Sequence, residues 1–599
     1  MTDQQELGQA VQKRNFEFFT QTKTTEPLTK PTSVFDIVEP TSSVRQQTLS
    51  PVPVQSTAET SYQAKRSSFR LFTILVALYL TLFVAALDQT IISTAIPTIT
   101  SSLSSASGYT WIGAAYLIAN AAAGPIWTKL SDIWGRKPML LSSVAFFFSA
   151  SIVCAEATSM KMLIVGRAFQ GTAAGGMLSL VIVTISDLFS MRRRALWLGI
   201  LEVMWAIAGG TGPVLGGIFA QDLSWRWIFW INLPVCGTTF FLLLLFLDVH
   251  NPKTRMVDGL KAIDWAGSLS ILAVTLMVLL GFDFGGETFP WTSPKVICLL
   301  VFGSFAILIF IFSEKRFAKY PLMPLFLFKN RSNVAALVVT LIHGIVFIAG
   351  EYYLPLFIQS TRGADPIYSG ILVLPLNLAE AIAGILCGIL MHHFHTHKEP
   401  ILCGTLLMTL GTGLYINLDW SSPITKLILF ELLGGFGIGL LFNPPIIAIQ
   451  NEVPQEHVAT ATSTQAFVRT MANAIGVVIG GIIFEHSMTE RYSDLVRAGL
   501  PENLLTSLSG EKAAANVGLV RIIHDAKQAQ AVKAAFAHSL RNMFIFYTCC
   551  AVLAVIAAFF VRGSRLSEVH QETRTGLLTY SKDNDKARAS TGDGIVGER

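Results

Sequence analysis

Two ionisable side chains stand inside otherwise apolar stretches and are the first candidates for chemistry. Asp88 lies in LDQTIISTAIP (residues 87–97) and Arg167 in LIVGRAFQGTAAGG (residues 163–176). A charged side chain in hydrocarbon costs about 2.5–3.5 kcal/mol on insertion scales, so its retention indicates a function. Burial disfavours an ionised carboxyl group and a nearby guanidinium favours it, which suits a proton-binding group that responds to conformation. The alternative is a fixed ion pair that holds two helices together.

The spacing of these two residues predicts that they lie at a similar depth in a membrane. Asp88 is about 17 residues into its apolar run, which is roughly 26 Å along a helix. Arg167 is about five residues, or roughly 8 Å, into a run that crosses in the opposite direction. We therefore expect both side chains in the outer half of the membrane and facing the interior of a bundle.

A charged loop separates the second and third apolar runs. It reads TKLSDIWGRKPML (residues 128–140), in which Gly135 permits a tight turn and Asp132 can meet the positive end of a neighbouring helix. Arg136 and Lys137 would anchor the loop at the membrane surface. The alternative is that these cations only set the orientation of the chain.

The fifth apolar run contains AIAGGTGPVLGG (residues 206–217). Pro213 removes a backbone hydrogen bond and bends a helix, while Gly212 and its neighbouring glycines allow another helix to approach closely. A bent and smooth helix suits two bundles that rock against each other. Plain helix packing is the alternative.

The elements that position these residues are membrane-spanning helices. Apolar residues form 52% of the 599-residue chain and charged residues 14%, against about 25% in soluble proteins. A helix needs about 20 apolar residues to cross a bilayer. We expect fourteen spans, at residues 71–92, 109–127, 139–157, 162–188, 195–219, 228–247, 263–282, 296–312, 334–357, 370–391, 401–418, 427–448, 461–484 and 542–560.

Lysine and arginine in alternate short loops predict the orientation. The richer set, which includes Arg192, Arg193 and Arg194, is expected on the cytoplasmic side, so both termini would be cytoplasmic. Residues 1–68 and 564–599 are expected to be cytoplasmic tails, the first of them disordered. The long loop at residues 485–541 would be extracellular, and its residues 525–540 could form an amphipathic helix on the outer surface.

The motifs together resemble those of the major facilitator superfamily, in the fourteen-span drug:proton antiporter branch common in fungi. Residues 128–140 are similar to the signature GxLaDrxGrkxxl but depart from it at Thr128 and Ile133. Residues 163–174 resemble the signature of the fourth helix. Gly212 and Pro213 match the antiporter signature of the fifth helix, with Ala208 in place of its first glycine. Residues 87–97 and 224–234 resemble two further motifs of that branch.

The resemblance implies an all-α membrane fold of two pseudo-symmetric six-helix bundles, at residues 69–250 and 321–563. Two extra helices at residues 251–320 would lie between them. It implies a proton-driven exporter of drugs or of a secondary-metabolite toxin, acting by alternating access. Proton coupling would fall to Asp88 and Arg167. Conformational gating would fall to Asp132, Gly135, Arg136, Lys137, Gly212 and Pro213.

Other polar residues are candidates for a substrate cavity in the membrane. They are Gln89, Gln170, Glu380 and Asn443. Glu380 would bind protons or cations there, or else be a buried group hydrogen-bonded to a neighbouring helix. The histidine-rich segment at residues 391–398 lacks carboxylates and cysteines, so we expect a cytoplasmic loop and no metal site.

Several classes of function are excluded or disfavoured. We find no nucleophile–base pair, Walker motif or dinucleotide loop, so we expect no catalytic residues, no enzyme activity and no cofactor other than a proton gradient. The expected partners are a small molecule, protons and the lipid bilayer, without nucleic acid, and the expected state is a monomer. The expected location is the plasma membrane, with the vacuolar membrane as the alternative. A proton-coupled uptake symporter, for example of siderophores, and a non-transporting receptor remain open alternatives.

Overall fold

The computed structural model describes residues 68–567, apart from 93–94, 104–107, 250–251, 253, 286–288, 318–320, 365 and 511. Within this part of the chain the regular structure is helical, and the only bridge between extended residues joins Gly285 to Phe289. Residues 1–67 and 568–599, which hold most of the two predicted tails, lie outside the described residues.

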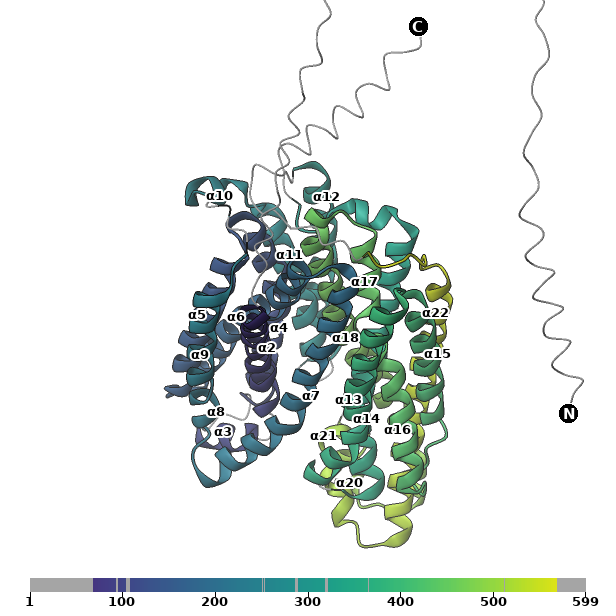
Figure 1. The fold of residues 1–599 in the computed structure, drawn as a ribbon. Helices are drawn as coiled ribbons and strands as arrows, with labels where there is room; N and C mark the ends of the chain where they lie inside the picture. The colour runs from purple at the N-terminus through teal and green to yellow at the C-terminus, as the bar shows by residue number, and fades with distance from the viewer. Residues whose placement is uncertain are drawn as a thin grey trace, which may run out of the picture. The chain divides into compact units, whose positions relative to one another are not determined.

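The first eight helices of the described chain form one bundle. They are α2 (Ser68–Ile91), α3 (Ile96–Ser102), α4 (Gly108–Trp134), α5 (Arg136–Ala155), α6 (Met160–Leu188), α7 (Met191–Asp222), α8 (Trp227–Trp230) and α9 (Asn232–Phe246). In this N-terminal bundle α6 packs against α4 and α5, while α2 packs against α7 and α9. These are the purple and blue helices of Figure 1.

A second group of long helices forms the C-terminal bundle. They are α13 (Arg331–Arg362), α14 (Pro366–Phe394), α15 (Lys398–Tyr415), α16 (Ile424–Gly439), α17 (Pro444–Asn451), α18 (Val458–Glu490) and α22 (Ala526–Phe559). Short helices connect them: η1 (Leu325–Lys329), η2 (Gln455–His457), α19 (Tyr492–Arg497), α20 (Glu502–Ser507), α21 (Lys512–Ala515) and η3 (Val517–Ile522). Here α13 packs against α18 and α22, α16 against α14 and α15, and α15 against α22.

The two bundles meet along two seams, and a helical hairpin flanks one of them. One seam joins α7 to α14 and the other joins α4 to α18. The hairpin consists of α11 (Trp265–Phe284) and α12 (Pro294–Arg316), and the short α10 (Met256–Ala262) precedes it. Because α11 contacts both α4 and α18, the hairpin lies beside the second seam (Figure 1).

Twelve helical segments of the described chain are long and apolar enough to cross a membrane. They match twelve of the fourteen predicted spans, and the chain is a multi-pass membrane protein. The remaining two predicted spans fall on α4 and α15, which are helical but are not among those twelve. The total of fourteen spans and the cytoplasmic location of the termini therefore stay predictions.

The structure differs from the sequence-based expectation at the long loop before the last span. Residues 525–540 do not form a separate surface helix, because they belong to the continuous α22. Asp525 caps this helix by accepting a hydrogen bond of 2.8 Å from the backbone nitrogen of Lys527. The helical run therefore extends about 24 Å before the predicted span at residue 542, at 1.5 Å per residue.

Candidate functional site

Asp88 and Arg167 lie together inside the N-terminal bundle, on α2 and α6. Nη1 of Arg167 donates a hydrogen bond to Oδ2 of Asp88, and the two charges form an ion pair. Asp88 is 0% exposed and Arg167 is 1% exposed. The two residues that the spacing predicted to lie at a similar depth thus share one buried site in the structure.

Two amide side chains complete the surroundings of the Asp88 carboxylate. Its Oδ1 accepts hydrogen bonds from Nδ2 of Asn232, at 2.8 Å, and from Nε2 of Gln170, at 3.2 Å. The Gln170 amide also donates to Oγ of Ser151 at 2.8 Å, while its oxygen accepts from Arg167 at 3.0 Å. Both carboxylate oxygens are therefore hydrogen-bonded, by donors that come from α6 and α9.

The guanidinium of Arg167 is itself held by α4. Its Nε donates to the carbonyl oxygen of Ile112 at 3.1 Å, and its central carbon lies 4.4 Å from the ring centroid of Tyr116. The Tyr116 hydroxyl donates in turn to the carbonyl oxygen of Ala85 at 2.9 Å. The site thus connects α2, α4, α6 and the start of α9. A change of charge at Asp88 would therefore alter contacts with four elements of the bundle.

A second buried charge network lies at the junction of α4 and α5. Nη1 of Arg136 contacts Oδ1 of Asp132 at 2.5 Å, and its Nε donates to Oδ2 of Asp187 at 2.8 Å. Asp187 lies near the end of α6, and no motif in the sequence singled it out. Lys137 lies outside this network and donates to the carbonyl oxygen of Leu244 on α9 at 2.7 Å. The loop therefore joins α4, α5, α6 and α9.

Gly135 forms the turn that brings Arg136 back to Asp132. Its backbone has φ 96° and ψ 158°, a conformation essentially restricted to glycine. The structure contains the tight turn that the sequence predicted. Asp132 does not cap α5, because it binds the Arg136 side chain and α5 has no side-chain cap.

The glycines of α7 differ in how closely neighbouring atoms approach them. A Cβ built on Gly212 would lie 2.2 Å from Oγ1 of Thr90, so this glycine permits close contact with α2. Gly209, Gly210 and Gly217 have nothing within 4 Å of such a Cβ, and the close approach expected at these three positions is absent. Pro213 lies inside α7, one residue after Gly212.

The close contact between the bundles occurs earlier along α7. A Cβ on Gly199 would lie 3.0 Å from the carbonyl oxygen of Gly384, and one on Gly388 would lie 2.8 Å from that of Ala195. The sequence motifs did not select these glycines. Because α7 approaches α14 here and has open space at Gly209, the two helices are in closest contact near the start of α7.

Polar contacts join the bundles at the same end, and sequence reasoning missed them. Nη1 of the buried Arg194 donates to Oε1 of Gln450 on α17 at 2.8 Å. Nε2 of Gln450 donates to Oγ of Ser186 at 3.2 Å and to Oγ1 of Thr462 at 2.8 Å. In the sequence Arg194 belongs to an arginine triplet, which predicted orientation only. The available signal for Gln450 was a lone amide in an apolar segment.

The remaining cavity candidates lie in different surroundings. Gln89 follows Asp88 and is half-buried. Asn443 and Glu380 are each 7% exposed and belong to the C-terminal bundle. Nδ2 of Asn443 lies 3.3 Å from Oε1 of Glu202 on α7, whereas Oε1 of Glu380 has no hydrogen-bond partner. Only Gln170 of these candidates contacts Asp88.

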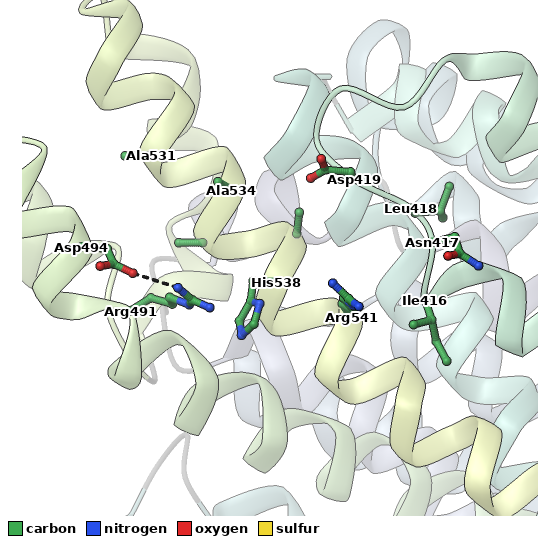
Figure 2. Close-up of a pocket in the computed structure, with 12 residues that line it drawn as sticks. Ile416, Asn417, Leu418, Asp419, Arg491, Asp494, Ala531, Ala534, His538 and Arg541 are labelled. Atoms are coloured by element: carbon green, nitrogen blue, oxygen red, sulfur yellow. Dashed lines mark hydrogen bonds and ion pairs between the residues drawn. The ribbon is translucent and has the colours of Figure 1, made fainter.

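A surface pocket of about 500 Å³ lies elsewhere in the molecule, between α22, α19 and the segment after α15 (Figure 2). Arg491 and Asp494 pair at 2.9 Å on one wall, and His538 and Arg541 project from α22. Asp494 is half-buried, and its hydrogen bond with Arg491 lowers its pKa. The pocket contains none of the predicted site residues.

Two helical bundles around buried charge networks are the architecture of a membrane transporter. The family model of the Major Facilitator Superfamily matches residues 78–477. The chain belongs to this superfamily.

Fungal relatives resemble the chain over most of its length. Efflux pump dotC of Dothistroma septosporum is 42% identical over 509 residues, which cover 85% of this chain and 87% of the relative. MFS-type transporter ppz2 of Metarhizium majus is 40% identical over 88% of this chain and 90% of its own. Efflux pump FUS6 of Gibberella moniliformis is 33% identical over 92% of this chain and 97% of its own.

Solved structures share the fold at low sequence identity. The proton:xylose symporter XylE aligns with a TM-score of 0.53 and 14% identity, over 84% of this chain and 98% of its own. This likeness concerns the fold alone.

Proposed function

We propose that the protein is a proton-coupled exporter of small organic compounds, either drugs or a secondary-metabolite toxin. The observation that carries the proposal is the 42% identity, over 85% of the chain, to a relative named an efflux pump. The buried charges and the two seams between the bundles support a mechanism of alternating access.

Proton coupling is assigned to Asp88 and its partner Arg167. In this conformation the Asp88 carboxylate pairs with Arg167 and accepts hydrogen bonds from the amides of Asn232 and Gln170. A movement that separates Asp88 from Arg167 would favour protonation, because an unpaired charge in a low-dielectric interior is costly. Proton entry supplies about 2.3 kcal/mol per 100 mV and about 1.4 kcal/mol per pH unit.

Conformational gating is assigned to two parts of the N-terminal bundle. The first is the loop with Asp132, Gly135, Arg136 and Lys137, whose network spans four helices. The second is α7, in which Gly212 and Pro213 follow the segment that meets α14. Gln89, Gln170, Glu380 and Asn443 are proposed to line the path of the substrate.

The proposed setting is the plasma membrane, with the vacuolar membrane as the alternative, and the proposed active unit is a monomer. The proton gradient is the energy source. Nothing in the proposal requires a bound cofactor or metal.

The test begins with cells that carry or lack the gene, exposed to a panel of organic toxins to find a transported compound. Everted membrane vesicles are then given an imposed pH gradient, acidic inside, and uptake of that compound is measured. Uptake that collapses with a protonophore supports proton-driven export. Accumulation only in right-side-out vesicles, driven by an inward proton gradient, would instead identify an uptake symporter.

A further inference from the structure

A row of glutamates crosses the C-terminal bundle and is not used by the Asp88 site. Glu431 lies on α16, Glu351 on α13 and Glu380 on α14, and Glu202 of α7 lies at the end of the row. Glu431 is 0% exposed and Glu380 is 7% exposed. Both carboxylate oxygens of Glu431, and Oε1 of Glu351 and of Glu380, have no hydrogen-bond partner among the described residues.

Close helix contacts fix the order of these residues. A Cβ on Gly350 would lie 3.4 Å from Leu376, and one on Gly435 would lie 2.5 Å from the Leu376 carbonyl oxygen, so α13 and α16 meet α14 at one level. Glu351 is the residue after Gly350 and therefore lies next to this level on α13. Glu431 lies four residues before Gly435 and Glu380 four residues after Leu376, so each is about 6 Å away along its axis.

The row continues from Glu380 to the other bundle. A Cβ on Gly384, one turn after Glu380, would lie 2.8 Å from Cγ of Glu202. Glu351 interacts electrostatically with both Glu380 and Glu431, and Glu380 also with Glu202. The glutamates therefore form a connected series that begins near Glu431 and ends at the seam between α7 and α14.

Tyr415 gives an independent indication that this region holds a ligand. It comes from a further helix, α15, and is 3% exposed, yet its hydroxyl has no hydrogen-bond partner. The hydroxyl lies 2.9 Å from the position of a Cβ on Gly434, one turn after Glu431. It interacts electrostatically with Glu431, Glu380 and Glu351, so a polar group faces all three acids.

Positive charge near the row is limited. Tyr415 on α15 and Glu202 on α7 interact electrostatically with the row, and Cys387 on α14 and Arg469 on α18 interact with Glu202. His343 on α13 interacts with Arg469. Arg469 interacts with Glu202, and its Nη2 donates to the Phe442 carbonyl oxygen at 2.7 Å. One arginine cannot balance four ionised carboxylates, and buried unpaired carboxylates take up protons instead.

We infer that Glu351, Glu380 and Glu431, together with the Tyr415 hydroxyl, form a second hydrogen-ion binding site inside the C-terminal bundle. It extends the proposed proton coupling by adding protonatable groups that are separate from Asp88. Protons suit the site better than a metal ion, because the described residues contain no set of three or more His, Cys, Asp or Glu placed to hold one. The row would carry protons toward Glu202 and the seam.

Infrared difference spectroscopy tests the inference without a known substrate, with the proton itself as the probe. The full-length protein in lipid bilayers is switched between acidic and alkaline buffer, in H₂O and in D₂O. Protonated carboxyl groups give a carbonyl band that shifts in D₂O. We expect each of Glu351→Gln, Glu380→Gln and Glu431→Gln to remove part of that band, and the triple variant to remove the sum.

Matched variants guard against misfolding and general effects. Glu490→Gln is the control, because the Glu490 side chain is 61% exposed, and it should leave the band from the row unchanged. Glutamine has the size of a neutral glutamic acid, so thermal unfolding should stay close to the wild type. Tyr415→Phe removes no carboxyl group and should shift the frequency of the band rather than its area.

The outcomes separate this inference from the proposed function. A triple variant with the band of the wild type would overturn the inference, even if export is proton-driven. Asp88→Asn should keep the part of the band that the three glutamates contribute while losing proton-driven export. A wild type that shows the band but no proton-driven export overturns the proposed function alone. Binding of tetraphenylphosphonium that the triple variant loses, with an unchanged carboxyl band, would identify an organic-cation site and overturn the proton assignment.

Discussion

Arg194 on α7 donates a hydrogen bond of 2.8 Å to Gln450 on α17, and this bond joins the two bundles. Arg192, two residues earlier, donates through Nε to the carbonyl oxygen of His392 at 2.7 Å. Both contacts lie near the start of α7, where the backbones of α7 and α14 are also in close contact. The structure therefore represents a conformation that is closed at this end.

Loss of the Arg194–Gln450 contact should favour the conformation that is open at this end. A hydrogen bond to a charged group is worth about 1.5–3 kcal/mol, so Gln450→Ala should raise the open population roughly tenfold or more. Ser463→Cys is a suitable reporter, because Ser463 is 2% exposed and its hydroxyl has no partner. In a background without native cysteines, maleimide should label it faster when Gln450 is replaced.

The control for this experiment is Gln528→Ala, which removes a contact to the Gly499 carbonyl oxygen in the segment after α19. It should leave the labelling rate of the reporter unchanged. Equal labelling in the Gln450→Ala protein and its parent would show that the contact does not hold the bundles together.

The Asp88–Arg167 pair allows the structural and functional roles to be separated. Arg167→Ala leaves a buried carboxylate unpaired and should lower the free energy of unfolding by about 3–5 kcal/mol. The double variant Asp88→Asn/Arg167→Gln removes both charges and should regain most of that stability, measured by detergent-induced unfolding. Proton-driven export should remain absent. A stable double variant that exports normally would reduce the pair to helix packing.

Gly135 should not tolerate a side chain. With φ 96° and ψ 158°, alanine or asparagine at this position should cost about 1–3 kcal/mol and misplace Arg136. Gly363 is the matched control, because its φ of 62° and ψ of 28° lie in the left-handed region that asparagine adopts. The temperature of thermal unfolding should therefore fall for Gly135→Asn and stay nearly constant for Gly363→Asn.

Two glycines of α7 should respond differently to the same substitution. Gly212→Ala would place its Cβ 2.2 Å from Oγ1 of Thr90 and should cost about 1–3 kcal/mol through overpacking against α2. Gly209→Ala has nothing within 4 Å and should be neutral or slightly stabilising. Unfolding temperature and transport rate, measured on both variants, check this difference; similar losses would mean that Gly209 also becomes packed during transport.

Much of the architecture follows from hydropathy, because a membrane requires long apolar helices that satisfy their own backbone. The start of α22 did not follow, since Ala526–Phe559 begins well before the predicted span at residue 542 and its first turn is capped by Asp525. The break between α16, which ends at Gly439, and α17, which begins at Pro444, falls where the sequence has Asn443, Pro444 and Pro445. A proline pair cannot continue the hydrogen-bond ladder of a helix.

The candidate site was predictable where a charge stood alone in an apolar run. Asp88 and Arg167 were selected on that basis, and Gln170 was selected as a polar candidate for the substrate cavity. The three residues lie in hydrogen-bond contact. Asn232 and Asp187 complete the two networks and were not selected. Partners of this kind come from distant helices, and their pairing depends on tertiary packing that no local pattern encodes.

The two seams between the bundles differ because α11 packs against only one of them. This helix touches both α4 and α18, whereas the hairpin makes no comparable contact with α7 or α14 among the described residues. When one bundle tilts against the other, α11 has to slide along at least one of its two neighbours. If the bundles part during transport, the seam between α7 and α14 can therefore open without displacing the hairpin, whereas the seam between α4 and α18 cannot.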